Sequence, residues 1–131
     1  MSFLPRLAPD RFVAAIGQCD VVLDSIGWSG CNSILESLAH NLPIVTLTGS
    51  LMRGRHATAI LKMIDVEETV TASTDEYVAM AVRIARDAAW RAALRTKIAQ
   101  NKQRLYHDRM CIAALEDLLE AKARGIGSAP S

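Results

Sequence analysis

The sequence has few aromatic residues, little net charge and no long hydrophobic run. Aromatic residues make up 5% of the 131 positions, which leaves few side chains on which single-stranded nucleic acid could stack. The formal net charge is +1, so electrostatics favours neither nucleic acid nor an anionic membrane as a partner. No apolar stretch approaches the length that spans a bilayer, and the N-terminus lacks the basic segment and apolar core of a secretion signal. We therefore expect no nucleic acid partner and no membrane span.

Cysteine is scarce as well. The three cysteines, Cys19, Cys31 and Cys111, are odd in number and widely spaced, and no two of them form a C-x-x-C motif. This pattern fits a reducing compartment better than a disulfide framework, and it predicts a cytoplasmic protein. No group of His, Cys and Asp residues has the spacing of metal ligands, so we predict no metal site. The spacing of the residues also identifies no Ser–His–Asp or Cys–His arrangement.

The residues that are present suit one globular domain. Half of them are hydrophobic and 22% are charged, as is ordinary for such proteins. Apolar runs at 21–23, 44–47 and 69–72 predict three strands, of which the first should be buried on both faces of a parallel sheet. Helical periodicity predicts helices over 10–17, 33–41, 53–64, a segment that begins at the capping box 73–76, a basic segment through 90–105, and 109–123. The expected fold class is α/β, a partial Rossmann-like parallel sheet of about three strands flanked by helices.

The strands are too few for a whole nucleotide-binding domain. A doubly wound domain usually begins with strands that this sequence does not show. We interpret residues 1–123 as the back half of such a domain and residues 124–131 as a flexible tail. The sheet edge where the missing strands belong would be exposed, which predicts a homo-oligomer formed through that edge.

A polar cluster stands where the first strand leads into the next helix. Ligands of open α/β sheets bind at the carboxyl ends of the strands, next to helix N-termini that attract phosphate. Gly30, Asn32 and Ser33 occupy that position, and Glu36 one turn later could accept both hydroxyls of a ribose. The same residues also fit a second interpretation. Ser33 and Glu36 form an S-x-x-E capping box, which occurs at many helices that bind nothing. Spacing alone leaves both interpretations open.

A basic cluster follows the second strand, at the same edge of the sheet. Arg53, Arg55 and His56 could hold a diphosphate and stabilise charge on a leaving group. Basic residues at a helix start oppose the macrodipole, so two arginines there favour an anionic ligand over a merely solvated helix start. Asp24 ends the first strand beside this region and could orient the turn or contact a ligand.

Five segments together resemble a known family. They are 3–6 (FLPR), 20–24 (DVVLD), 28–39 (WSGCNSILESLA), 42–47 (LPIVTL) and 52–56 (MRGRH). They resemble the C-terminal catalytic domain of the O-GlcNAc transferase (SPINDLY-like) glycosyltransferases, whose fold is GT-B, over roughly residues 3–120. The piece from Glu36 onward is common to many GT-B enzymes, whereas the Trp-Ser-Gly and Met-Arg-Gly-Arg-His pieces are more specific.

The resemblance implies a function and a role for several residues. A UDP-sugar would be the donor, held by the C-terminal of two Rossmann-like domains, with Asn32 and Ser33 on the diphosphate and Glu36 on the ribose. Arg55 would lie near the donor as a candidate stabiliser of the leaving UDP. No metal or other cofactor would be required, and the sugar would pass with inversion to a hydroxyl of a protein or glycan. Cys31 stands where glycine or histidine is usual, and a thiol donates poorly to phosphate.

The resemblance also implies partners that this sequence lacks. An N-terminal GT-B domain and, in bacterial members, tetratricopeptide repeats would complete the enzyme, so the isolated chain should not catalyse transfer. Two alternatives remain. The chain could be a non-catalytic remnant or oligomerisation module in which the motif only caps a helix. It could also be a fragment of a GT-B UDP-sugar epimerase, against which the Met-Arg-Gly-Arg-His cluster argues.

Overall fold

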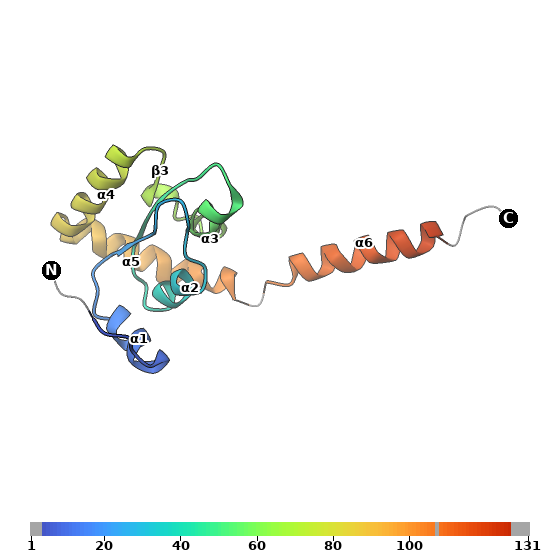
Figure 1. The fold of residues 1–131 in the computed structure, drawn as a ribbon, viewed down its shortest axis with the longest axis horizontal. Coiled ribbons are helices and arrows are strands. Elements are labelled where there is room, and N and C mark those ends of the chain that lie inside the picture. Colours follow the sequence, from blue (N-terminus) through green and yellow to red (C-terminus); the bar gives the residue numbers. More distant parts are fainter. Residues whose placement is uncertain (1–3, 107, 127–131) are drawn as a thin grey trace.

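Helices and short strands alternate along the part of the chain that the computed structural model describes, residues 4–106 and 108–126 (Figure 1). The elements are α1 (Pro9–Ile16), β1 (Val22–Leu23), α2 (Asn32–Ala39), β2 (Ile44–Leu47), η1 (Met52–Gly54), α3 (His56–Met63), η2 (Glu67–Thr69), β3 (Val70–Thr71), α4 (Thr74–Arg86), α5 (Ala88–Asn101), η3 (Lys102–Leu105) and α6 (Met110–Ile126). None of the helices in these two ranges is both long enough and apolar enough to cross a membrane.

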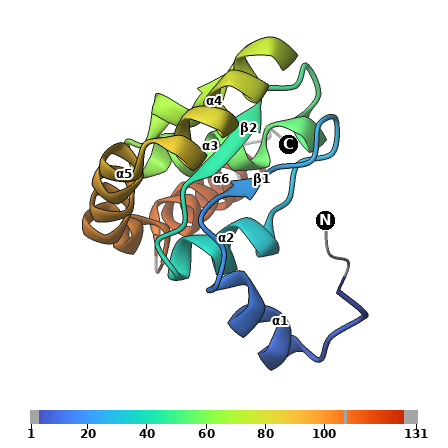
Figure 2. The same ribbon diagram turned by 90° about the vertical axis from the view of Figure 1, so that its left-hand side faces the viewer.

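The three strands form one parallel sheet in the order β1-β2-β3. Val22 of β1 is in register with Ile44 of β2, and Thr46 of β2 is in register with Val70 of β3. Figure 2 shows β1 and β2 side by side, with α1 and α2 below them. Helices α2 and α3 connect consecutive parallel strands, as such crossovers require. The predicted α/β fold, a three-stranded parallel sheet flanked by helices, is confirmed.

The hydrophobic core surrounds β2. This strand has a neighbour on each side and is contacted by α3 and α4, so Ile44 and Val45 are fully buried. The helices supply the rest of the core from the apolar faces that the sequence predicts. Its fully buried helical residues and their neighbours are Ile34, Leu38, Ala57, Leu61, Ile64, Val66, Ile84 and Ile98.

The prediction that the first strand is buried on both faces is wrong. Val22 is half-buried and Leu23 is 54% exposed. The physical reason is that β1 lies at the edge of the described sheet. The N–H groups of Val22 and Asp24 donate to carbonyls of the β2 segment, each at 2.9 Å, and no strand in the described ranges pairs with the other side. The exposed edge expected from the missing strands is therefore present.

Helix boundaries follow local signals at some positions and not at others. The predicted cap of α4 is confirmed, because Ser73 Oγ accepts the Glu76 N–H at 3.2 Å. The helix predicted to start at residue 53 begins instead at His56, after the 3-10 turn η1. The predicted basic helix ends its α-helical part at Asn101 and continues as η3.

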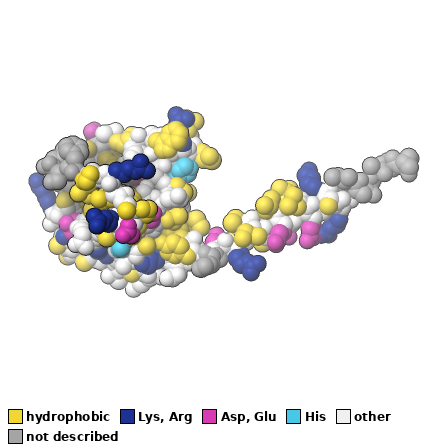
Figure 3. All heavy atoms as spheres, turned by 60° about the horizontal axis from the view of Figure 1, so that its bottom comes forward, with side chains coloured by type: hydrophobic (Ala, Val, Ile, Leu, Met, Phe, Trp, Pro, Cys, Tyr) yellow, Lys and Arg dark blue, Asp and Glu magenta, His cyan; other side chains and the backbone are white. Residues whose placement is uncertain are grey.

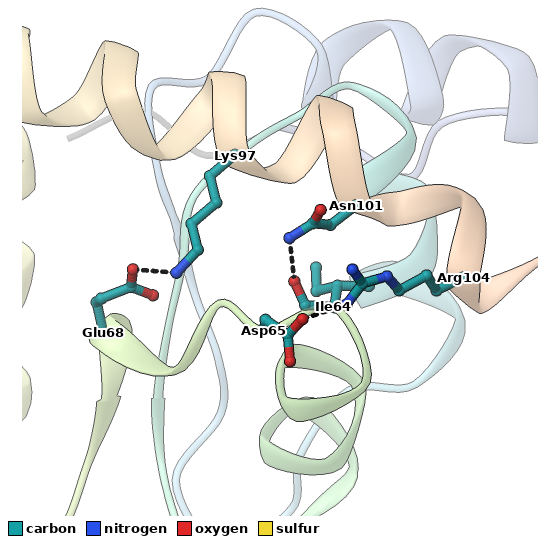
Figure 4. Close-up of polar contacts among 6 residues, drawn as sticks. All are labelled: Ile64, Asp65, Glu68, Lys97, Asn101 and Arg104. Carbon is teal, nitrogen blue, oxygen red and sulfur yellow. Dashed lines mark hydrogen bonds and ion pairs between the residues drawn. The ribbon is translucent and has the colours of Figure 1, made fainter.

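Polar contacts fasten α5 and η3 to the segment after α3 (Figure 4). Asn101 Nδ2 donates to the Ile64 carbonyl at 2.8 Å, and Arg104 pairs with Asp65. Lys97 pairs with Glu68. The pKa of the Glu68 carboxyl is lowered from its ordinary value. Burial alone would raise this pKa, but the hydrogen bonds that the carboxylate accepts and the Lys97 charge together outweigh the effect of burial.

Helix α6 extends away from the rest of the molecule (Figure 1). Its described side chains, from Met110 to Arg124, are all exposed, and they include Ile112, Leu115 and Leu119 at 48–61% exposure. Figure 3 shows hydrophobic side chains along this protruding helix. The helix continues to Ile126, past the predicted end at residue 123, while residues 127–131 of the predicted tail lie outside the described residues.

Candidate functional site

The loop that follows β1 is organised by a buried carboxylate. Asp24 is 5% exposed and accepts three hydrogen bonds, from Ser29 Oγ at 2.7 Å, from the Gly30 N–H at 2.8 Å and from Thr46 Oγ1 at 2.8 Å. Its own carbonyl accepts the Tyr77 hydroxyl at 2.8 Å. A buried carboxylate is tolerated only when its oxygens are satisfied in this way. The network fixes the position of Gly30 at the entrance to α2.

Tyr77 is held as a hydrogen-bond donor by its surroundings. Burial raises the pKa of its phenol, and the negative charge of Asp24 raises it further. The hydroxyl therefore keeps its proton over the neutral range and ties α4 to the end of β1. Asp24 orients the turn, which was one of the two roles that its position in the sequence left open.

Ser29 joins the two predicted clusters. Its hydroxyl accepts the Ala57 N–H at 2.9 Å, and its own N–H donates to the Arg53 carbonyl at 2.8 Å. The His56 ring nitrogen Nδ1 lies 3.4 Å from the Ser29 carbonyl. Through these contacts, the start of α2 and the basic segment 53–56 lie next to each other at the carboxyl edge of the sheet, as predicted from the order of the elements.

The N-terminus of α2 is open to solvent. The helix begins at Asn32, and Cys31, Asn32 and Ser33 are all exposed. No side chain caps this end. The N–H groups of Ile34 and Leu35 donate to the Cys31 carbonyl, whereas those of Asn32 and Ser33 have no acceptor among the described residues and lie at the positive end of the macrodipole. The capping-box interpretation of Ser33 and Glu36 is wrong, because the helix starts before Ser33 and places that residue in the first turn.

Gly30 allows the loop to lie against the first turn of α2. A Cβ at this position would lie 2.6 Å from Ser33 Oγ and 3.2 Å from Cγ1 of Ile34. Any larger residue would therefore displace the Ser33 hydroxyl or separate the loop from the helix. The close approach expected of a small residue here is thus made to the helix itself.

Glu36 lies one turn further along α2 and is half-buried. Among the hydrogen bonds and ion pairs of the described residues, none involves its carboxylate, in contrast to Glu68 and Glu76. Since the capping contact to Ser33 is not formed, the Glu36 carboxylate is available to accept hydrogen bonds from a bound ligand.

The basic cluster lies on a tight loop before α3. Arg53 belongs to η1 and its guanidinium lies 5.8 Å from the centroid of the Trp28 ring, while Arg55 Nε donates to the Gly49 carbonyl at 2.6 Å. Gly49 and Gly54 close the loop, because a Cβ at either position would lie 3.1–3.2 Å from the Cα of the other. Both arginines are exposed at the entrance of α3 and leave other guanidinium N–H groups for an anion.

Sequence reasoning missed two residues that build this site. Ser29 is 3% exposed and Tyr77 is 9% exposed, and both act through contacts far apart in the chain. Only the buried position of Tyr77 on its helix could be anticipated. Residues 4–106 and 108–126 contain no group of three or more His, Cys, Asp or Glu side chains placed to hold a metal ion.

Comparisons with known proteins agree on one family. The family model described as glycosyl transferase family 41 matches residues 7–113. A probable UDP-N-acetylglucosamine–peptide N-acetylglucosaminyltransferase SPINDLY from Solanum lycopersicum is 34% identical over 68 residues, which are 52% of this chain and 7% of that protein. A UDP-N-acetylglucosamine–peptide N-acetylglucosaminyltransferase from Caenorhabditis elegans is 32% identical over 102 residues, which are 76% of this chain and 9% of that protein.

A solved structure gives the same result. A mutant of the Thermobaculum terrenum O-GlcNAc transferase superposes with a TM-score of 0.74 and 31% sequence identity, over 91% of this chain and 23% of that one. The chain thus spans less than a quarter of the length of each of these relatives. None of them is named as an epimerase, and none supports the predicted homo-oligomer.

Proposed function

The chain belongs to glycosyltransferase family 41, and from this premise we propose that it is the UDP-sugar-binding part of an inverting O-glycosyltransferase, incomplete on its own. The donor would be a UDP-sugar such as UDP-N-acetylglucosamine, and the acceptor a hydroxyl of a protein serine or threonine or of a glycan. The relatives support this choice, because they are named as UDP-N-acetylglucosamine–peptide N-acetylglucosaminyltransferases. A cytoplasmic location remains part of the proposal.

One observation carries the proposal: Ser29 brings the uncapped start of α2 together with the arginine-bearing loop. Backbone N–H groups and the helix dipole attract a diphosphate, and the side chains of Asn32 and Ser33 can add hydrogen bonds. The guanidinium groups of Arg53 and Arg55 lie on the adjoining loop. A ligand that lies along α2 would place its ribose hydroxyls at Glu36.

The same groups suit the proposed chemistry. Transfer of the sugar leaves negative charge on UDP, and fixed dipoles and cations that face this charge stabilise the transition state. Arg55 and the N-terminus of α2 would supply that stabilisation without a metal ion. The acceptor hydroxyl and the base that deprotonates it would come with the rest of the enzyme, an N-terminal GT-B domain and in some members tetratricopeptide repeats.

A UDP titration of the chain, followed residue by residue by NMR, tests the proposal. Shifts should cluster at residues 30–36 and 53–56. Glu36→Ala should weaken UDP binding by about tenfold, as expected for the loss of hydrogen bonds to a charged group. Its free energy of unfolding should change little, because this carboxylate forms no hydrogen bond or ion pair among the described residues.

Glu67→Ala is the matched control, since that glutamate is exposed and its one ion pair among the described residues is with Lys62 at 3.8 Å. It should leave the UDP affinity unchanged. An affinity of Glu36→Ala equal to that of the unmodified chain would refute the ribose role. Shifts spread over the molecule, or none at millimolar UDP, would refute the donor site.

A further inference from the structure

An aromatic side chain stands exposed beside the proposed donor site. Trp28 is 70% exposed and lies in the loop between β1 and α2, two residues before Gly30. Other large hydrophobic residues nearby in the chain are also exposed. Ile26, in the same loop, is 54% exposed, and Leu51 and Met52, in the loop that carries Arg53, are 54% and 79% exposed. Several exposed apolar side chains on the loops that carry polar groups of a site are a common feature of binding surfaces.

The exposed indole lies next to an anchored backbone segment and to a cation. Arg53 lies near its ring at 5.8 Å, and the next residue, Ser29, is fixed by Asp24 and by the Arg53 carbonyl. The backbone directly after Trp28 is thus anchored to the loop that carries Arg53. A side chain that is positioned before a ligand arrives loses little conformational freedom on binding.

The order of groups in a nucleotide sugar matches the order of residues along this edge. A donor with its ribose at Glu36 and its diphosphate at the start of α2 runs down the helix toward its N-terminus. Glu36 lies about 5.4 Å, one turn, from that end. The hexose, attached to the far phosphate, then continues past Gly30 to the loop that carries Trp28, beside Arg53 of η1.

We propose that Trp28 is the platform on which the hexose ring of the donor packs, and that it determines specificity for that sugar. This inference rests on the proposed function. The C–H groups of one pyranose face are apolar and match a flat indole, while the Arg53 guanidinium beside the ring can donate to sugar hydroxyls or to the near phosphate. Trp28 therefore acts on the sugar and not on the nucleotide.

Tryptophan fluorescence distinguishes the sugar from the nucleotide. The chain contains two tryptophans, and Trp90 is half-buried with Arg83 at 3.9 Å from its ring. In a Trp90→Phe background, Trp28 is the sole tryptophan and can be excited selectively over the tyrosines. UDP-N-acetylglucosamine should shift the Trp28 emission to shorter wavelength as the ring loses water, and UDP should do so much less.

Affinities of variants complete the test. Trp28→Ala should weaken binding of the UDP-sugar by about fivefold to tenfold and leave binding of UDP unchanged, because only the sugar contact is lost. Trp28→Phe should restore most of the difference. Val78→Ala, which trims another exposed apolar side chain on α4, is the control and should change neither affinity.

Each other outcome overturns a defined claim. If Trp28→Ala weakens UDP and the UDP-sugar equally, or weakens neither, the platform role is wrong while the donor site stands. If the unmodified chain binds neither ligand at millimolar concentration, the proposed function and the platform role both fail.

Discussion

At the scale of single residues, Asp24 determines the geometry of the site. Replacing it with asparagine keeps the size of the side chain but replaces one acceptor oxygen with an amide N–H₂, so at least one of the three hydrogen bonds that the carboxylate accepts is lost. An unsatisfied buried group costs about 1–3 kcal/mol. We expect Asp24→Asn to lower the free energy of unfolding by that amount in urea denaturation. Asp20→Asn is the control, because the Asp20 side chain is 71% exposed and lies 3.6 Å from its partner Arg91. Equal losses of unfolding free energy in the two variants would show that the hydrogen bonds of Asp24 stabilise the fold no more than an exposed ion pair does.

Cys31 offers a chemical probe at the same scale. The three cysteines are all exposed, and only Cys31 stands at the start of α2. If the diphosphate binds there, saturating UDP should slow alkylation of Cys31 by several-fold and leave Cys19 and Cys111 unchanged. Mass spectrometry of peptides from one sample measures all three rates, so the other two cysteines are internal controls. Equal alkylation rates with and without UDP would contradict the placement of the diphosphate.

At the scale of elements, the Lys97–Glu68 pair links α5 to the segment before β3. The pKa of Glu68 is lower in the folded chain than its ordinary value. The stabilisation is therefore present above the ordinary value and is lost as the pH falls through the lowered one. We expect Glu68→Gln to be less stable than the unmodified chain near neutral pH, by at most about 1 kcal/mol because the pair is exposed. This difference should shrink in acid, as measured by urea denaturation across pH. Glu67→Gln should show a smaller change, and a difference that is constant with pH would contradict the role of the pair.

The elements also show which features the sequence could and could not predict. Ser73 and Glu76 form the predicted cap because all of its atoms are local to one turn. Ser33 and Glu36 carry the same pattern without forming it, since Asp24 holds the Gly30 N–H and the helix begins before Ser33. The two site segments could be predicted to share one edge because parallel strands end there together. The contact that joins them, from Ser29 to Ala57, spans 28 positions and has no local signal.

At the scale of the whole molecule, the folded body and α6 contribute differently to stability. The core and the residues packed against it end at Leu105, and the Tyr106 hydroxyl donates to the Leu35 carbonyl at 3.1 Å. The described side chains of α6 are all exposed, so little apolar surface is buried when this helix forms. In most proteins helices are stabilised chiefly by tertiary packing of an apolar face, which this 17-residue helix does not have in the described residues.

We therefore expect a chain that ends after Tyr106 to keep the free energy of unfolding and the urea midpoint of the full chain. Its far-UV circular dichroism should lose only the helical signal of α6. A chain that ends after Asn101 is the matched comparison. It removes η3, including Leu105 and the Arg104–Asp65 pair, and it should unfold at a lower urea concentration. A loss of stability on removal of α6 alone would mean that its apolar face, with Ile112, Leu115 and Leu119, packs against the body in solution.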